Sequence, residues 1–468
     1  MQEEKSVHII GLCGVGMSAT ALLLKEAGWE VTGSDAECYG PPKAILERGG
    51  LALRMPYAPS NIPAEVDRFV VGRNAKLSPD TNDEVRAAHD TGRPIQSFPQ
   101  VLGELTEGRE NVVVAGSYGK STTAALIAHI LRHSGVDTGY FIGAEPVSLP
   151  FPAALGTAPV FVLEGDEYPS AHDDARAKFM HLKPRDVVLT AVVHDHVNVY
   201  PTFESYQLPF RELLALVPDD GMVVTCADEP SALALAEASG KTVVAYGIDA
   251  GHFRAANIAY GPTTTFTLLR PDGGDIELST TLLGRHNVED IVGAAAYVLA
   301  RDIVPAAALP AAVASFGGVR RRLDNIAPSS RVPVYEGFGS SYEKARAATA
   351  ALKLHYPDRR LVTVFEPHTF GWRNRANLHW YDDVFAGSEL VFVAPPETQG
   401  ASTHDQLSHE EILGRVADSG IVARPYLHDD VPQTVDALSE NDVVLVLTSG
   451  SLEGTLETLA RAITERFS

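Results

Sequence analysis

Two glycine-rich segments combine residue types and a spacing that suit phosphate binding. The first spans residues 11–17 after the apolar run 7–10, and the second spans residues 116–122 after the apolar run 112–115. Each lies between an expected strand and an expected helix, so backbone N–H groups at the helix start can bind an anion. Two such loops predict two phosphorylated ligands in one chain, which favours a transferase or a ligase.

The second loop also carries the residues that bind a Mg-nucleoside triphosphate. Lys120 can reach the β and γ oxygens, and Ser121 or Thr122 can face Mg²⁺. The loop departs from GxxxxGK[ST] because Val114 occupies the first glycine position, and an isolated match of this kind also arises by chance. The expected ATP-binding residues in the loop are Gly116, Ser117, Gly119, Lys120, Ser121 and Thr122.

The first loop has the weaker pattern, G-x-x-G-x-G. Asp35 follows its glycines by about 20 residues, at the end of the next expected strand, as in dinucleotide-binding βαβ units. The pattern predicts a pyrophosphate at the helix start and Asp35 near a ribose or a base. The alternative is a tight turn with no ligand.

Charged side chains follow two further expected strands. Glu164 follows the strand 160–163 and offers hard oxygen ligands for Mg²⁺. His196 follows the apolar run 186–193 and could help to hold a second metal ion. Arg322 lies in a run of three arginines that could clamp a transferring phosphoryl group. Each has a simpler interpretation as a solvated acidic turn, a structural histidine or an exposed basic face.

Composition excludes several classes of protein. The chain has 468 residues with 60 acidic and 38 basic side chains, a net charge of −22, which argues against binding to nucleic acid or an anionic membrane. No apolar run approaches 18 residues, and the polar N-terminus does not resemble a signal peptide. Cys13, Cys38 and Cys226 have no CxxC spacing and are too few for a disulfide framework, so we expect a reducing, cytoplasmic setting.

Strand-like runs alternate with helical stretches along the chain, which is typical of α/β domains with largely parallel sheets. The length predicts about three domains. We place them at residues 1–108, 109–326 and 327–468.

Taken together, the motifs and their order resemble those of the Mur ligases over essentially the whole chain. The segments that carry the resemblance are VHIIGLCGVGMSATA with GSD near the N-terminus, GSYGKSTTA around Lys120, LEGDEY at 163–168, RAKF at 176–179, GRHNV at 284–288 and FGGVRRRLD at 316–324.

The resemblance implies an N-terminal Rossmann-like domain that binds a UDP-sugar, a central P-loop ATPase domain, and a C-terminal Rossmann-like domain for the incoming amine. It implies an ATP- and Mg²⁺-dependent ligase that joins a UDP-N-acetylmuramate-type carboxylate to an amino acid or short peptide through an acyl phosphate, acting as a monomer or weak homodimer. Lys120, Glu164, His196 and Arg322 are then catalytic, with Ser121, Glu164 and His196 as metal ligands. Asn287 and Arg322 join the ATP site. The implied UDP-sugar residues are Gly14, Val15, Gly16, Met17, Ser34 and Asp35.

Within the family, several segments are most similar to the murein peptide ligase branch, which attaches a recycled tripeptide, whereas YPDRRLVTVFEPH resembles the branch that adds L-alanine. Two family motifs are altered. The family's N-x-E-x-DH appears with Ala191 and Val193 before Asp195-His196, and its DD[FY][GA]HHP appears as EGFGSSY at 336–342. A ligase of the same chemistry acting on another substrate pair, a non-catalytic nucleotide-binding protein and an NAD-dependent oxidoreductase are the alternatives. The oxidoreductase leaves the second loop without a role.

Overall fold

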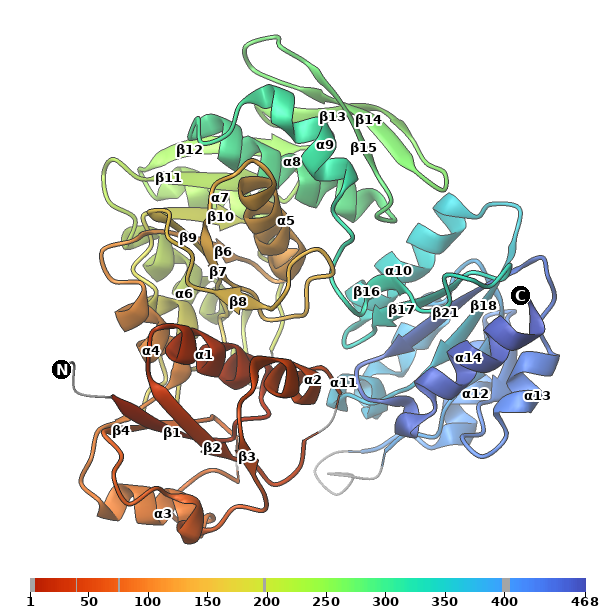
Figure 1. Cartoon of the computed structure of the whole chain (residues 1–468). Coiled ribbons are helices and arrows are strands. Elements are labelled where there is room, and N and C mark those ends of the chain that lie inside the picture. The colour runs from red at the N-terminus through yellow and green to blue at the C-terminus, as the bar shows by residue number, and fades with distance from the viewer. Residues whose placement is uncertain (1–4, 39, 75, 197–198, 398–404) are drawn as a thin grey trace. The chain divides into compact units, whose positions relative to one another are not determined.

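The computed structural model describes the chain except residues 1–4, 39, 75, 197–198 and 398–404 (Figure 1). Helices and three sheets alternate along it, which confirms the expected α/β class. The chain forms two compact units. The first contains Met1–Asn257, Phe266–Ser279 and Glu289–Gly317, and the second contains Ile258–Thr265, Thr280–Val288 and Gly318–Ser468. The limits of the three domains stay a prediction.

The N-terminal sheet is parallel and has the strand order β3-β2-β1-β4-β5. In this order the chain reverses direction across the sheet between β1 and β4, and ligands of such sheets bind beyond the carboxyl ends of the strands at that point. The elements are β1 (Ser6–Ile10), α1 (Val15–Glu26), β2 (Glu30–Ser34), α2 (Gly40–Gly49), β3 (Leu53–Arg54), the 3₁₀ turn Pro59–Asn61, β4 (Arg68–Val71), α3 (Asp83–Asp90), β5 (Ile95–Gln96) and α4 (Phe98–Leu105).

The central sheet contains the second glycine loop. Its strand order is β15-β14-β13-β12-β11-β10-β6-β9-β7-β8. Its strands are β6 (Glu110–Ala115), β7 (Gly139–Phe141), β8 (Ala153–Ala154), β9 (Val160–Glu164), β10 (Asp186–Leu189), β11 (Met222–Cys226), β12 (Thr242–Gly247), β13 (Phe253–Ala259), β14 (Thr264–Leu269) and β15 (Ile276–Thr280). Its helices are α5 (Lys120–His133), α6 (Phe203–Ala215), α7 (Pro230–Ala238), α8 (Arg285–Ala300) and α9 (Leu309–Ala314), with 3₁₀ turns at Lys178–His181 and Ala306–Ala308.

Strand β6 lies between β9 and β10 and is parallel to both. Its apolar run is continuous because both faces of the strand are covered, as in most parallel sheets. The carboxyl ends of the three strands therefore meet at one edge of the sheet. The glycine loop and the segment 190–196 follow these ends, and Glu164 is the last residue of β9, so this edge collects most of the expected ATP-site residues.

The C-terminal sheet has the order β16-β17-β21-β18-β19-β20, and only the edge strand β16 is antiparallel to its neighbour. The elements are β16 (Arg322–Asn325), β17 (Val334–Phe338), α10 (Tyr342–His355), β18 (Arg360–Phe365), α11 (Phe370–Arg373), the 3₁₀ segment Arg375–Asp382, β19 (Ser388–Val393), α12 (His409–Asp418), β20 (Val422–Pro425), α13 (Val431–Asp436), β21 (Asp442–Thr448), the 3₁₀ turn Leu452–Gly454 and α14 (Leu456–Arg466).

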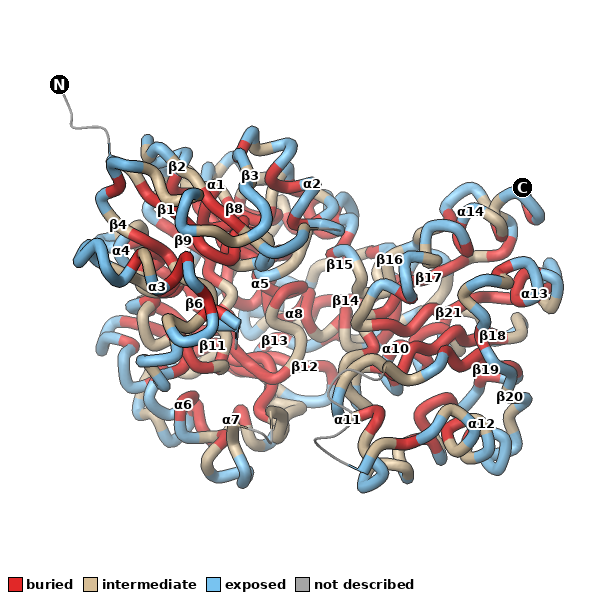
Figure 2. Tube along the Cα trace, turned by 90° about the horizontal axis from the view of Figure 1, so that it is seen from below, coloured by how far each residue is buried: buried red, intermediate tan, exposed pale blue. Residues whose placement is uncertain are grey.

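The strands of the sheets are mostly buried, and exposed residues gather in loops and on the outer faces of helices (Figure 2). Among the described residues, no helix combines the length and apolar composition that a membrane span needs.

The cysteines differ from the sequence-based expectation of reduced thiols. Cys13 and Cys38 form a disulfide, whereas Cys226 is buried and free. The pair lies 25 residues apart with no diagnostic spacing, and the two cysteines come together because β1 and β2 are adjacent and parallel. One disulfide is not a disulfide framework, but it is a covalent link at the first glycine loop.

A buried carboxylate holds the N-terminal sheet to its surrounding segments. Glu84 is fully buried and accepts hydrogen bonds from His8, Ser34, Asn61 and the Ala58 N–H. Burial alone would raise the pKa of Glu84, but the hydrogen bonds, led by those of His8 and Ser34, lower it below its ordinary value of 4.5. Folding therefore favours the carboxylate, and its contribution to stability is present above pH 4.5 and is lost as pH falls through the lowered native pKa.

We expect Glu84→Ala to lower the free energy of unfolding of the first unit by about 2–4 kcal/mol at neutral pH, because it leaves several buried donors without an acceptor. The difference from the wild type should shrink in acid. Chemical denaturation measures the change in the free energy of unfolding, and hydrogen exchange of β1 and β2 shows whether the N-terminal sheet is the part that loses stability. Asp83→Ala is the matched control because that neighbouring side chain is exposed. Equal effects of the two substitutions would contradict the prediction.

Candidate active site

The second glycine loop has a backbone that only glycine fits at two positions. Gly116 has φ +145° and Gly119 has φ +78°, both in the region that L-residues rarely adopt. A Cβ at Gly116 would lie 2.2 Å from the Thr190 hydroxyl, and one at Gly119 would lie 2.6 Å from Asp290 Oδ1. The loop therefore closes tightly between β10 and α8, directly before α5.

Ser117 ties this loop to the segment that follows β10. Its N–H donates to Ala191 O at 2.9 Å, its hydroxyl donates to Val193 O at 2.8 Å, and the Val193 N–H donates to the same hydroxyl oxygen at 2.8 Å. Tyr206 donates to this oxygen as well, at 3.0 Å. At positions 191 and 193 these contacts use only main-chain atoms, so the replacement of the family's Asn and Glu there leaves the tether intact.

Lys120 pairs with a carboxylate to which the sequence analysis gave no role. Its ammonium lies 3.0 Å from Glu167 Oε2, and it also donates to Gly116 O. Burial alone would lower the pKa of Lys120, but the charges of Glu167, Asp166 and Glu164 outweigh it and raise the pKa above its usual value. Lys120 is therefore held charged at the phosphate loop. The signal for Glu167 was its place in LEGDEY, four residues after the expected strand.

Glu167 also contacts the expected metal-binding histidine. Its side chain is 1% exposed, and Oε1 lies 3.4 Å from His196 Nε2 and accepts from Tyr206 at 3.2 Å. Burial would raise the pKa of Glu167, but Lys120 and His196 hold it well below the usual range. Burial likewise opposes the charge on His196, while Glu167 and Asp195 raise its pKa. One carboxylate thus links the P-loop lysine to the histidine.

The residues expected to bind Mg²⁺ lie together in part. The Ser121 hydroxyl donates to Glu164 Oε1 at 2.8 Å, and Glu164 Oε2 accepts from the Gly143 N–H at 2.6 Å. A hydroxyl and a carboxylate beside a phosphate loop are the hard oxygen donors that Mg²⁺ prefers, so these residues fit the ion. His196 instead contacts Glu167, the carboxylate that pairs with Lys120. Thr122 and Thr123 are buried in the first turn of α5, where Thr123 donates to Asp290.

In the first glycine loop, the structure separates the expected residues into two groups. Gly14 is the exposed N-cap of α1, Val15 is 40% exposed, and Gly16 packs so closely that a Cβ would lie 3.1 Å from the Phe98 ring. Met17 and Ser34 are buried: Met17 packs in the core of the N-terminal sheet, and Ser34 donates to Glu84. These two side chains therefore serve the fold, and the main-chain oxygen of Ser34 accepts from the N–H groups of Gly11 and Leu12.

Asp35 is held at the edge of this loop. Its Oδ2 accepts from the Cys13 N–H at 2.7 Å, and its Oδ1 accepts from the Tyr57 hydroxyl and the Ala36 N–H, both at 2.7 Å. The pKa of Tyr57 is raised mainly by burial and, as the second cause, by its hydrogen bond to Asp35. Asp35 thus joins the end of β2 to the glycine loop.

Asn287 and Arg322 belong to the second unit. Asn287 is buried in the first turn of α8 and donates to Leu283 O at 2.7 Å. The Arg322 guanidinium lies over the Phe338 ring, 4.8 Å from its centre. The neighbouring Arg321 donates to Glu336 at 2.7 Å, so the first residue of the altered EGFGSSY segment binds an arginine.

A cluster in the second unit was not among the predicted site residues. Glu366 follows β18, Glu397 follows β19, and His368 Nδ1 lies 3.0 Å from Glu397 Oε1. Thr448, at the end of β21, donates to Glu366. The sequence signal was the segment FEPH directly after a strand, at the edge where parallel sheets bind ligands.

Models of two protein-domain families match this chain. The model of the Mur ligase family catalytic domain matches residues 6–110, and that of the Mur ligase middle domain matches residues 114–298.

Curated relatives and solved structures agree with the domain models. The UDP-N-acetylmuramate–L-alanine ligase of Halorhodospira halophila is 31% identical, covering 96% of this chain and 92% of that protein. The UDP-N-acetylmuramate–L-alanyl-γ-D-glutamyl-meso-2,6-diaminoheptandioate ligase of Escherichia coli is 32% identical over 78% of this chain and 79% of its own length. The UDP-N-acetylmuramate–alanine ligase of Thermotoga maritima has the same fold, with a TM-score of 0.79 over 98% of both chains at 22% identity. The murein peptide ligase of Psychrobacter arcticus gives 0.72 at 25% identity, over 98% of this chain and 99% of that one.

We expect Lys120→Met to abolish nucleotide-dependent phosphate release and to lower the free energy of unfolding by about 3 kcal/mol, because Glu167 loses the partner of its buried charge. The double substitution Lys120→Met with Glu167→Gln should recover the stability but not the activity. Thermal unfolding and a phosphate-release assay measure the two effects. Lys183→Met, which breaks an exposed ion pair with Glu107, is the control. Phosphate release at the wild-type rate by Lys120→Met would contradict the site.

Proposed function

This chain belongs to the Mur ligase family of ATP-dependent, amide-bond-forming ligases, and we propose from that premise that it joins the carboxylate of UDP-N-acetylmuramate to an amino acid or a short peptide. The observation that carries the proposal is the cluster of Lys120, Ser121 and Glu164 around the phosphate loop, in a chain whose relatives at about 31% identity are named for this acyl substrate. Asp35 and the first glycine loop are the proposed site for its nucleotide.

The first choice for the amine is the tripeptide L-alanyl-γ-D-glutamyl-meso-diaminopimelate, which would make the enzyme a recycling ligase. The similarity of the N-terminal and central motifs to the murein peptide ligase branch supports it, as does the relative from E. coli. L-Alanine is the second candidate. The relatives named for L-alanine that align over nearly the whole chain support it, together with the segment YPDRRLVTVFEPH.

The chemistry follows from the charges at the site. The substrate carboxylate attacks the γ-phosphorus of ATP, ADP leaves, and the amine then attacks the acyl phosphate and expels phosphate. Lys120 would neutralise the β and γ oxygens while the loop N–H groups hold them in place, since positioning and charge neutralisation dominate phosphoryl transfer. Ser121 and Glu164 would hold one Mg²⁺ and His196 would help to hold a second, and these ions would supply further positive charge to the phosphates.

Two anionic reactants meet in a protein of net charge −22, so the positive charge must be local. Glu167 keeps Lys120 in place and charged, at the distance of a direct ion pair. A triphosphate that reaches Lys120 would compete with Glu167 for the ammonium.

We expect phosphate release from Mg-ATP and UDP-N-acetylmuramate to depend on the added tripeptide. Parallel reactions contain L-alanine instead, or no amine, and Lys120→Met serves as the inactive control. Release that depends on L-alanine would instead identify a first-step ligase. No release in any mixture, with ATP still bound, would contradict the proposed substrates and favour a different carboxylate and amine pair.

A further inference from the structure

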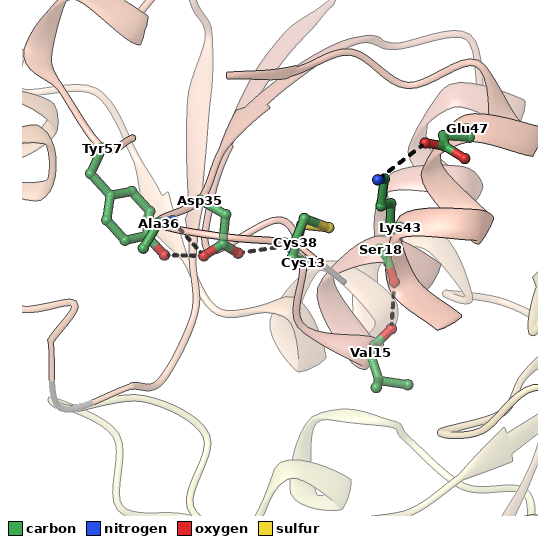
Figure 3. The surroundings of a disulfide bond; sticks show 9 residues. All are labelled: Cys13, Val15, Ser18, Asp35, Ala36, Cys38, Lys43, Glu47 and Tyr57. Atoms are coloured by element: carbon green, nitrogen blue, oxygen red, sulfur yellow. Dashed lines mark hydrogen bonds and ion pairs between the residues drawn. A yellow bond between two sulfur atoms is a disulfide. The ribbon is translucent and has the colours of Figure 1, made fainter. Parts of the chain in front are cut away.

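A disulfide joins the two segments that border the proposed nucleotide-sugar site. Cys13 lies in the first glycine loop, between β1 and α1, and Cys38 lies in the segment that follows β2. Their Cα atoms are 5.5 Å apart (Figure 3). Both residues are partly exposed at the edge of the N-terminal core.

The bridge closes a ring that includes Asp35. Cys13 donates its N–H to Asp35 Oδ2 at 2.7 Å and is bonded through sulfur to Cys38, three residues after Asp35. Tyr57 holds the other carboxylate oxygen from the opposite side (Figure 3). The position of Asp35 relative to the glycine loop therefore depends on a covalent bond as well as on hydrogen bonds.

The same loop sets the start of α1. The first N–H groups of an α-helix have no partner within the helix, and the N-cap residue Gly14, which directly follows Cys13, has no side chain to cap them. These groups are the ones that bind a pyrophosphate at a helix start. The Cys13–Cys38 bond thus restricts the position of Asp35 relative to the start of α1.

We propose that Cys13 and Cys38 form a reversible redox site that controls the affinity of the first loop for the nucleotide sugar. The proposal rests on the proposed function, because it takes UDP-N-acetylmuramate as the ligand of this loop. The oxidised protein binds the ligand more tightly, since the bridge removes motions of the two segments that binding must otherwise arrest. Partly exposed disulfides are also the kind that exchange readily with small thiols.

The redox step needs a low-molecular-weight disulfide such as glutathione disulfide as its oxidant. One protein thiolate attacks it, forms a mixed disulfide and releases one glutathione thiolate. The second protein thiolate attacks the protein sulfur of that mixed disulfide and releases the second glutathione. Two protein thiols are oxidised, one glutathione disulfide is reduced to two glutathione thiols, and an excess of reduced thiol reverses the sequence.

The test is calorimetric titration of the full-length protein with UDP-N-acetylmuramate and with UDP, after equilibration in glutathione disulfide or in dithiothreitol. Alkylation followed by mass measurement gives the state of each cysteine. We expect the dissociation constant to rise on reduction by on the order of tenfold, a typical coupling between two sites. Mg-ATP affinity should stay the same in both states, because its loop lies on a different sheet.

Two variants assign the effect to the bridge. Cys38→Ser should bind UDP-N-acetylmuramate as weakly as the reduced wild type in either condition. Cys226→Ala removes the buried, free cysteine and should keep the full response to reduction. Hydrogen exchange of residues 11–17 should increase on reduction in the wild type and in Cys226→Ala, and should be high throughout in Cys38→Ser.

Each contrary outcome has a distinct meaning. A bridge that does not form in glutathione disulfide, or equal dissociation constants in the two states of an enzyme that still turns over UDP-N-acetylmuramate, overturns the redox proposal and leaves the proposed function standing. Neither binding nor turnover of UDP-N-acetylmuramate in either state overturns both. A response to reduction that persists in Cys38→Ser overturns the assignment to this pair.

Discussion

The ion pair of Lys120 and the buried Glu167 sets the charge of the phosphate loop. A lysine enclosed at a helix start would lose its proton to burial without a counter-charge, and a carboxylate as deeply buried as Glu167 would gain one. Together each keeps the other ionised. Through Tyr206 and His196 the same carboxylate reaches α6 and the segment after β10, so the loop, the helix and His196 share one electrostatic partner.

The parts of the site that could be predicted from the sequence follow from strand order. Lys120, Ser121 and Glu164 each follow the end of an apolar run, and parallel strands place such ends along one edge. The α/β fold could be predicted because strand-like and helical runs alternate along the chain. The family could be predicted because its motifs keep their order. Asn287 and Arg322 were named from the resemblance alone, and their place beside the nucleotide stays a prediction.

The rest depends on burial and on contacts between distant segments, which no local pattern encodes. Glu167 has a signal in its place within LEGDEY, but that position does not reveal its burial or its contacts with Lys120 and His196. Met17 has the spacing of a loop residue, yet its side chain completes the core because the helix turns it inward. The pairing of Cys13 with Cys38 depends on the adjacency of β1 and β2, and a spacing of 25 residues gives no sign of it.

The tether between Ser117 and the segment after β10 has a consequence for how such sites diverge. It is built from the main-chain atoms of Ala191 and Val193, which every residue type supplies equally except for the N–H that proline lacks. Substitution can therefore erase the side-chain signature of this segment while the loop geometry persists. A chain can therefore lose the residue types of a motif and still keep the backbone conformation that the motif formed.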